Sequence, residues 1–314
     1  MKFRTEITLK PYSFRLNYHS KIFGLGSCFV GHLKQKFEYY QFEHLINDFG
    51  VVFNPHSILT LLNRIVKQDF YTPDDFFYFQ NQWKNFELHS SLNHISQEDI
   101  LLTVNNRLKN NLNFLKKTDL AIFTFGSSWV YRHKKSQKIV SNCHKVPQQQ
   151  FDKILLSINE IVDIIGEIIS ILQQTNKQIK ILFTVSPVRH LKDGFIENQQ
   201  SKAHLIASLH HFNQTDNVFY FPSYEIMMDD LRDYRFYTKD LLHPNELAVE
   251  YIWEKFKKVL IHNEIYDDMK MVDKIRKSLQ HKPFEKDSIA YQQHLQKTKQ
   301  LISLFRKKYP KMKF

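Results

Sequence analysis

Short apolar runs recur along the chain, and each is followed by turn residues and then by a segment with helical spacing. Runs of this length between turn residues are typical of strands that are buried on both faces. Their alternation with amphipathic helices predicts an α/β fold with a parallel sheet of about five strands, in the order 2-1-3-4-5, covered on both faces. The runs lie at residues 22–25, 45–53 with an interruption at 47–50, 120–125, 179–185 and 218–221.

Several of the intervening segments begin with residues that favour the N-terminus of a helix. Asn54 and Pro55 open a helix whose apolar side chains repeat every three or four residues. Ser157 and Glu160 form a capping box before a long helix. Further helices are expected at about residues 30–40, 97–117, 198–213 and 246–260, and hairpins in the aromatic segment 70–94 and at 129–140.

The first apolar run leads into its helix through Gly26, Ser27 and Cys28. A strand-to-helix turn of this kind lies at the carboxyl edge of a parallel sheet, against a helix N-terminus. The free N–H groups and the dipole there favour negative charge, which suits a thiolate or an oxyanion. A Cys28 thiol at this position is expected to have a pKa below its usual ~8.5. In the alternative interpretation, Ser27 only caps the helix and Cys28 fills the core.

Turns after later strands bring further candidate groups to the same edge. Gly50 ends the interruption of the second run, Gly126 follows the third run, and Asp240 and His243 lie in one loop late in the chain. An aspartate three residues before a histidine can orient that imidazole as the base for a nucleophile. The same spacing also arises from a surface aspartate beside a capping histidine, so it leaves both interpretations open.

The composition predicts a globular protein with a sizeable core, since 42% of the residues are hydrophobic and 14% are aromatic. The two cysteines, Cys28 and Cys143, cannot form a disulfide framework. The N-terminal residues contain no apolar stretch of signal-peptide length, and no segment approaches the length of a membrane span. We therefore expect a reduced, cytoplasmic protein.

The net charge of +12 is concentrated near the C-terminus. Residues 265–314 contain 13 Lys and Arg against 5 Asp and Glu, so most of the excess lies in the last fifty residues. This predicts an α/β domain at 1–264 and a basic helical extension at 265–314. Because the charge belongs mainly to the extension, nucleic acid is not expected as a partner of the main domain.

The order of the motifs resembles the GSCFA domain family. The motif that names this family stands at residues 26–30 as Gly-Ser-Cys-Phe-Val, with valine in place of the final alanine. The resemblance covers roughly residues 20–255 and continues in the segments 125–131, 142–145, 184–191, 221–225 and 243–244.

This family looks like a branch of the SGNH, or GDSL-type, hydrolase superfamily, which has a three-layer α/β/α, flavodoxin-like fold. Its members are mostly esterases and acyltransferases. The resemblance implies that Cys28 takes the place of the nucleophilic serine, with Ser27 as the alternative nucleophile. It also implies that His243 is the base and that Asp240 orients it.

The same resemblance implies which groups stabilise the oxyanion. They are the backbone N–H groups of Cys28 and Gly50 and the hydroxyl of Ser128. Ser128 stands where the superfamily has an asparagine, and Ser27 stands where it has an aspartate. These departures fall on functional positions and weaken the expectation of strong ester hydrolysis.

Candidate substrate-binding residues come from the family-like motifs. Arg189 and His190 follow a strand and are expected to hold an anionic group of the substrate or of a carrier. The alternative is a salt-bridged loop. Gly126, Trp129 and His144 are included as further substrate-binding candidates because their motifs match the family.

A metal site formed by Cys28, Cys143, His144 and His243 is a different interpretation. Its spacing matches no compact zinc pattern, so neither a metal nor another cofactor is expected. The leading expectation is a hydrolase or acyltransferase that acts through a covalent acyl-enzyme on a small-molecule or glycan ester, with an acyl carrier as a possible partner. The main alternative is a non-catalytic carbohydrate- or carrier-binding module with the same fold. A protein that associates with nucleic acid through its basic extension is the third class.

Overall fold

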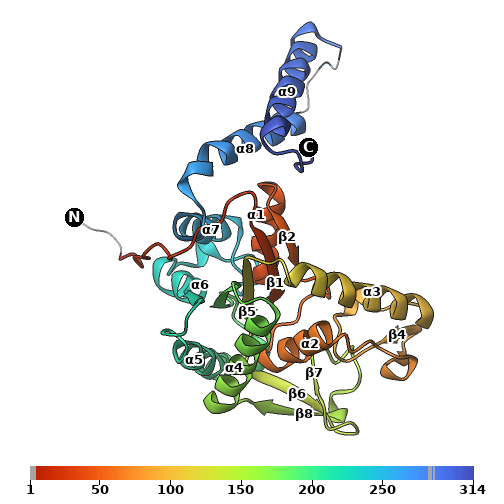
Figure 1. The fold of residues 1–314 in the computed structure, drawn as a ribbon. Helices are drawn as coiled ribbons and strands as arrows, with labels where there is room; N and C mark the ends of the chain where they lie inside the picture. The colour runs from red at the N-terminus through yellow and green to blue at the C-terminus, as the bar shows by residue number, and fades with distance from the viewer. Residues whose placement is uncertain (1–4, 282–284, 286) are drawn as a thin grey trace.

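A computed structural model describes residues 5–281, 285 and 287–314. Its centre is a five-stranded sheet in the order β10-β9-β5-β1-β2, in which every neighbouring pair is parallel (Figure 1). The strands are β1 (Lys21–Gly26), β2 (Glu43–Ile46), β5 (Leu120–Phe125), β9 (Lys180–Val185) and β10 (Val218–Phe221). Numbered in chain order, this arrangement is 2-1-3-4-5, so the predicted fold class and strand order are confirmed.

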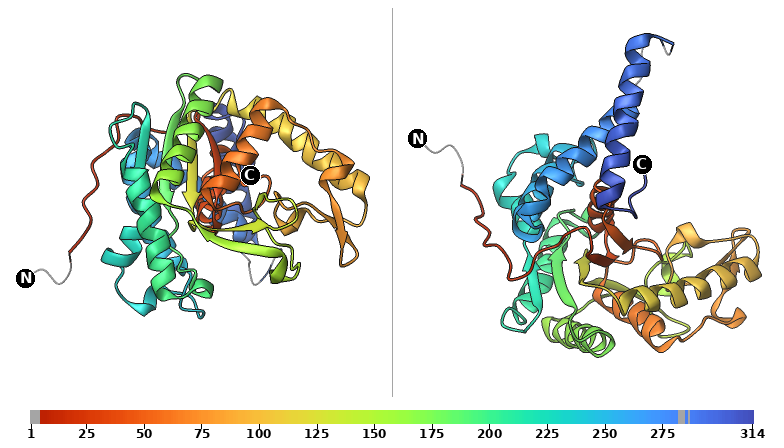
Figure 2. Two further views of the ribbon diagram at one scale, coloured as in Figure 1. Left: turned by 90° about the horizontal axis from the view of Figure 1, so that it is seen from below. Right: turned by 45° about the horizontal axis from the view of Figure 1, so that its top comes forward.

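Helices cover both faces of the sheet and form two hydrophobic cores (Figures 1 and 2). Alternate residues of a strand point to opposite faces, so Ile22 of β1 packs in one core and Phe23 in the other. One face carries α1 (Cys28–Tyr39) and α7 (Glu246–Leu260). The other face carries α2 (Pro55–Lys67), α3 (Gln97–Leu115), α4 (Ile158–Thr175) and α5 (Phe195–His210). Two sets of helices on a parallel sheet make the predicted three-layer arrangement.

The turn from β1 to α1 depends on a glycine. Gly26 has a φ of 155°, and a Cβ atom built on it would lie 2.5 Å from the carbonyl oxygen of Thr124. Both its N–H and its carbonyl are bonded to the side chain of Asn47, at 2.9 and 3.2 Å. The backbones of β1 and β5 therefore approach too closely at this point for any other residue.

Replacing Gly26 with alanine is expected to lower the free energy of unfolding by about 3 kcal/mol, because the clash is with backbone atoms that cannot rotate away. Gly31, inside α1, is the matched control, since a Cβ atom there meets nothing within 4 Å. Gly31→Ala should be neutral or stabilising by up to about 1 kcal/mol. Urea unfolding of the two variants measures both effects. Equal effects would contradict the assigned close approach.

Some of the elements expected from the sequence differ from the structure. The second strand ends at Ile46 instead of reaching residue 53, because Asn47 has a φ of 50° and turns the chain into a loop. The helix expected at 198–213 runs from Phe195 to His210. The hairpin at 129–140 is present as β6 (Trp129–His133) and β7 (Ile139–Val140), but it has a third strand, β8 (Phe151–Leu155), that was not predicted.

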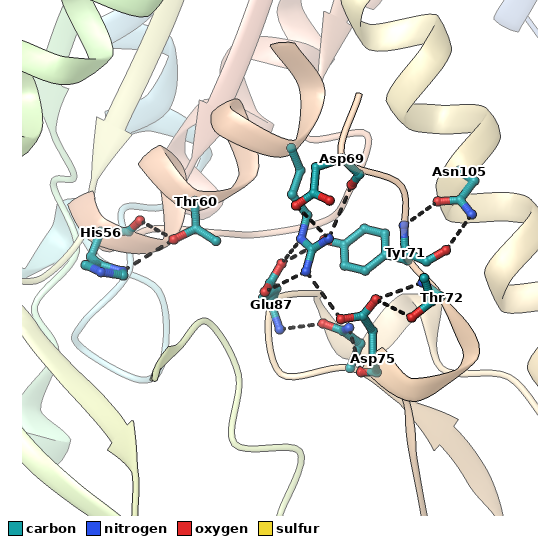
Figure 3. Close-up of polar contacts among 10 residues, drawn as sticks. His56, Thr60, Asp69, Tyr71, Thr72, Asp75, Glu87 and Asn105 are labelled. Atoms are coloured by element: carbon teal, nitrogen blue, oxygen red, sulfur yellow. Dashed lines mark hydrogen bonds and ion pairs between the residues drawn. The ribbon is translucent and has the colours of Figure 1, made fainter. Parts of the chain in front are cut away.

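The aromatic insertion contains the predicted hairpin, β3 (Phe77–Phe79) and β4 (Gln82–Lys84). Arg64 of α2, which is nearly buried, ties the insertion to the main domain. Its guanidinium donates to the carboxylates of Asp69, Asp75 and Glu87, and Glu87 also accepts from the hydroxyl of Tyr71 (Figure 3). This network fixes the insertion and is separate from the catalytic candidates.

The C-terminal extension consists of α8 (Tyr266–Gln280) and α9 (Ile289–Lys308), which project from the side of the molecule that carries α1 (Figures 1 and 2). It has its own small cluster of buried side chains. Tyr39 of α1 donates to Asp273, and Met269 packs into the core beneath α7. The extension therefore has a core of its own and also contacts the main domain, and the domain boundary at residue 265 stays a prediction. The side chains of its own cluster are Val272, Ile275, Phe305 and Met312.

None of the helices in the described part of the chain is long and apolar enough to cross a membrane.

Candidate functional site

The two candidate nucleophiles have different surroundings. Ser27 is only 1% exposed and serves as the N-cap of α1, where its hydroxyl accepts the N–H of Phe29 at 3.3 Å. Its own N–H donates to the carbonyl of Thr124 at 3.0 Å. Cys28 is the first residue of α1, and its thiol is free and partly buried. Of the two, Cys28 is the residue that reaches an accessible position.

The environment of Cys28 acts on its thiol in two opposing directions. Burial raises the pKa of Cys28, and this outweighs the backbone N–H groups of Cys28 and Phe29 and the charge of Lys202, which lower it. The expectation of a depressed pKa is therefore wrong for the protein without substrate. Burial disfavours the Cys28 thiolate by more than the helix N-terminus stabilises it. Ionisation of Cys28 near neutral pH needs a base.

Asp240 and His243 form a tightly held pair. Asp240 Oδ2 lies 2.6 Å from Nδ1 of His243, so the imidazole donates this proton and Nε2 remains the basic nitrogen. The other oxygen, Oδ1, accepts from the hydroxyl of Thr238 at 2.5 Å and from the N–H groups of Leu242 and His243. These hydrogen bonds hold the pKa of Asp240 well below its usual range. The pair has the geometry of a base with its orienting carboxylate.

The His243 loop lies next to the loop after β9, because the N–H of Arg189 donates to the carbonyl of Leu242 at 3.4 Å. It is also close enough to His32 of α1 for a charge on His243 to act on His32. His32, one turn beyond Cys28, has a pKa lowered by burial and also by the nearby His243. His190, in the loop after β9, has its pKa lowered to about 4 by burial, Lys202 and His243. No hydrogen bond joins Cys28 to His243 among the described residues. Such contacts are often long before substrate binds.

The structure corrects two of the three oxyanion donors that the resemblance implied, Gly50 and Ser128. The N–H of Gly50 donates to the carbonyl of Asn47 at 2.8 Å, because Gly50 closes the turn after β2. Ser128 is completely buried, and its hydroxyl donates to the carbonyl of Ser201 on α5 at 3.1 Å. Neither group is free to bind an oxyanion in this structure. Of the three implied donors, the backbone N–H of Cys28 at the start of α1 remains.

Three of the substrate-binding candidates have structural partners. The carbonyl of Gly126 accepts a hydrogen bond from Lys202, and Trp129 Nε1 donates to the carbonyl of Glu197 at 3.1 Å. His144 is 3% exposed and its Nε2 contacts the carbonyl of Asn85 in the aromatic insertion at 2.7 Å. His144 therefore packs the insertion, and no contact between described residues brings it to the Asp240–His243 pair.

Arg189 does lie beside the catalytic candidates. Its N–H donates to the carbonyl of Leu242 at 3.4 Å, and its guanidinium contacts the sulfur of Met228 at 3.0 Å. It lines a cavity of about 440 Å³ that Asp240 also borders. Aliphatic and aromatic side chains form most of the remaining wall, including Leu191, Phe195, Met227, Tyr234, Tyr237 and Leu241.

Sequence reasoning missed Lys202. This side chain is fully buried, and its ammonium group donates to the carbonyls of Gly126 and Ser186 at 2.7 and 2.9 Å. A helical register anchored on Leu205 and Leu209, which are both buried, would have placed residue 202 on the same inward face. The helical periodicity thus indicated an inward position for residue 202, but a lysine is normally assigned to the solvent-exposed face of a helix.

His190 makes stability depend on pH, because its ring is stacked on Phe53 and its Nε2 is buried without a hydrogen-bond partner. The unfolded chain takes up a proton near pH 6.5, whereas the folded protein does so only near pH 4. Stability is thus lost as pH falls through this window, by about 3 kcal/mol at pH 4. His190→Gln should flatten this part of a urea-unfolding pH series. The exposed His211→Gln should not, and identical slopes for the two variants would contradict the assignment.

No group of three or more His, Cys, Asp or Glu side chains in the described residues is arranged to hold a metal ion. The proposed set of Cys28, Cys143, His144 and His243 is not brought together either, since His144 lies in the packing of the insertion.

Comparison with solved structures finds weak similarity to esterases, among them the following three. A carbohydrate esterase family 3 protein from Talaromyces cellulolyticus has 7% identity and a TM-score of 0.36, with 80% of this chain and 98% of that one covered. A mutant acetyl esterase with an acetate ion has 9% identity and a TM-score of 0.37, covering 81% and 99%. An acetyl xylan esterase from the rumen bacterium Butyrivibrio proteoclasticus has 9% identity and a TM-score of 0.38, covering 84% and 65%. Similarity at this level assigns neither a site nor a reaction to this chain.

Curated proteins give no match to this sequence. Family comparison is more specific. Residues 272–314 match the C-terminal domain of GSCFA domain proteins. Residues 21–256, which contain the whole central sheet, α1 and the Asp240–His243 loop, match the GSCFA family. The chain belongs to the GSCFA family.

Proposed function

We propose that the protein is an acyl-ester hydrolase or acyltransferase that works through a covalent acyl-enzyme on Cys28. The observation that carries this proposal is the 2.6 Å contact between Asp240 Oδ2 and His243 Nδ1. It fixes the imidazole with Nε2 as the base, in a loop that packs beside α1 and the β9–α5 loop. Cys28 begins α1, and the raised pKa of its thiol calls for such a base.

In the proposed reaction, Nε2 of His243 takes the proton from Sγ of Cys28 while the sulfur attacks the acyl carbon. A C–S bond forms, and the carbonyl oxygen becomes an oxyanion near the N–H of Cys28. The ester C–O bond then breaks, and the His243 imidazolium gives its proton to the departing alcohol. Water or a second alcohol attacks the thioester with His243 again removing a proton, which returns the thiol.

The cavity beside Asp240 supports a substrate with an apolar or ring-shaped portion next to its ester. Tyr234 and Tyr237 offer aromatic faces to a sugar ring or an acyl chain, and Arg189 offers a charged donor to an anionic substituent. A volume of about 440 Å³ accommodates a small molecule or one end of a glycan.

The test is pre-steady-state hydrolysis of p-nitrophenyl acetate by the purified full chain. A burst of about one nitrophenolate per protein, followed by slow turnover, is the expected result for a covalent intermediate. Adding a short-chain alcohol then distinguishes transfer from hydrolysis by the ester it produces. Hydrolysis at the background rate would reject the proposal.

A non-catalytic binding module is the second candidate, and the internal partners of Gly50 and Ser128 favour it. A site with few free oxyanion donors binds an ester more readily than it stabilises a transition state. Saturable binding of an acylated sugar by calorimetry, together with no burst, would select this alternative.

A further inference from the structure

Lys202 is held at the carboxyl edge of the sheet by two strands. Its Nζ donates to the carbonyl of Gly126, directly after β5, and to that of Ser186, directly after β9. The side chain has no solvent exposure, and Nζ lies 5.4 Å from the centre of the Tyr224 ring. The lysine thus occupies a fixed position between the turns that follow β5 and β9.

A buried ammonium group needs more compensation than two neutral carbonyls provide. Within the described part of the chain, no carboxylate forms an ion pair with Lys202. Arg189 and His190 lie close enough to repel a charge on it. The turn that carries Cys28 lies beside the turn that holds this lysine, because Gly26 is paired with Thr124 and the N–H of Ser27 donates to the carbonyl of Thr124, two residues before Gly126. A thiolate on Cys28 favours the protonated lysine. The lysine in turn favours the thiolate.

We propose that Lys202 is the positive partner of the Cys28 thiolate, acting through Cys28 and not on the substrate. It is a positioning residue that compensates the charge of the nucleophile. The effect of Lys202 on catalysis rests on the proposed function, whereas the pairing of its charge with that of the Cys28 thiolate does not.

The titration of Lys202 and Cys28 can be followed because His190, Tyr224 and Arg189 keep their charge states over the pH range of the test. His190 has its pKa lowered to about 4, so it stays neutral above pH 6, and burial raises the pKa of Tyr224 beyond its usual value. Arg189 keeps its charge throughout, as guanidinium groups do in proteins. Burial lowers the pKa of Lys202 itself to about 7. The base His243 is present in every variant below.

The test measures the rate of iodoacetamide alkylation of Cys28 from pH 6 to 9.5 in the full chain, with Cys28 and Cys143 followed separately by peptide mass spectrometry. Lys202→Met removes the charge and keeps the length of the side chain. We expect its Cys28 to react about tenfold more slowly at pH 7, with the apparent pKa about one unit higher. The rate at Cys143 should not change.

Lys84→Met is the matched control, because Lys84 is also buried, at 4% exposure, but belongs to the hairpin of the aromatic insertion. It should leave the Cys28 profile as in the wild type. A folded Lys202→Met variant with the wild-type profile would overturn the pairing, and so would an equal shift in Lys84→Met.

A second measurement does not depend on the folding of the lysine variant. In protein labelled with ¹³C at the lysine ε-carbons, the Lys202 signal is titrated in the wild type and in Cys28→Ala. Loss of the thiolate should lower the pKa of Lys202 by about half a unit or more, and an unchanged titration contradicts the proposal. Neither experiment uses an ester, so an inactive protein with coupled charges would reject the proposed function alone.

Discussion

Replacing Cys28 with alanine is expected to reduce kcat/KM for p-nitrophenyl acetate by more than about 1,000-fold, to near the uncatalysed rate. The change removes the sulfur that forms the acyl-enzyme, and without it His243 has no nucleophile to activate. Steady-state nitrophenolate release measures the loss. Cys143→Ser is the matched control, because Cys143 is the other free cysteine of the chain, and it should retain activity within about twofold.

Ser27→Ala separates the two candidate nucleophiles. Ser27 is the buried N-cap of α1, so its loss should cost about 1 kcal/mol of stability and leave the burst in place. A burst that persists in Cys28→Ala and disappears in Ser27→Ala would make Ser27 the nucleophile and Cys28 its packed neighbour.

Replacing His243 with alanine is expected to lower kcat/KM by about 100- to 10,000-fold, the range for loss of a general base. Asp240→Asn should cost less, because the imidazole remains and loses only the carboxylate that orients it through the 2.6 Å contact. The exposed His211→Ala serves as control. Alkylation of Cys28 at pH 7 should slow in the same order.

An Asp240→Asn variant that is as impaired as His243→Ala would show that the tautomer, and not only the presence of the imidazole, limits the reaction. Wild-type activity in His243→Ala would remove the base from the mechanism.

The fold was largely predictable because its strands are buried on both faces. In β5, all six residues are buried and the apolar run has the bounds of the strand. Helix α7 likewise begins and ends where Asn245 and the apolar periodicity predict. The second strand was extended too far because Val52 and Phe53 are apolar although they lie in a loop. Val52 fills the core, and Phe53 stacks on His190.

The site was only partly predictable. The Asp240–His243 pair follows from local spacing, since His243 comes three positions after Asp240 in one turn. The partners of Ser128 and Lys202 could not be read from spacing, because they join β5 and its following turn to α5, more than seventy residues away. Tertiary contacts of this kind decide which polar groups are free for chemistry.

The most direct test of the central claim is the location of the acyl group after the full chain is quenched during turnover of p-nitrophenyl acetate. Peptide mass spectrometry should find one acetyl group on Cys28 in the wild type and in Cys143→Ser, with more of it in Asp240→Asn if deacylation also needs the base. An acetyl group on Ser27, on Cys143 or on scattered lysines, with Cys28 unmodified, would contradict the account.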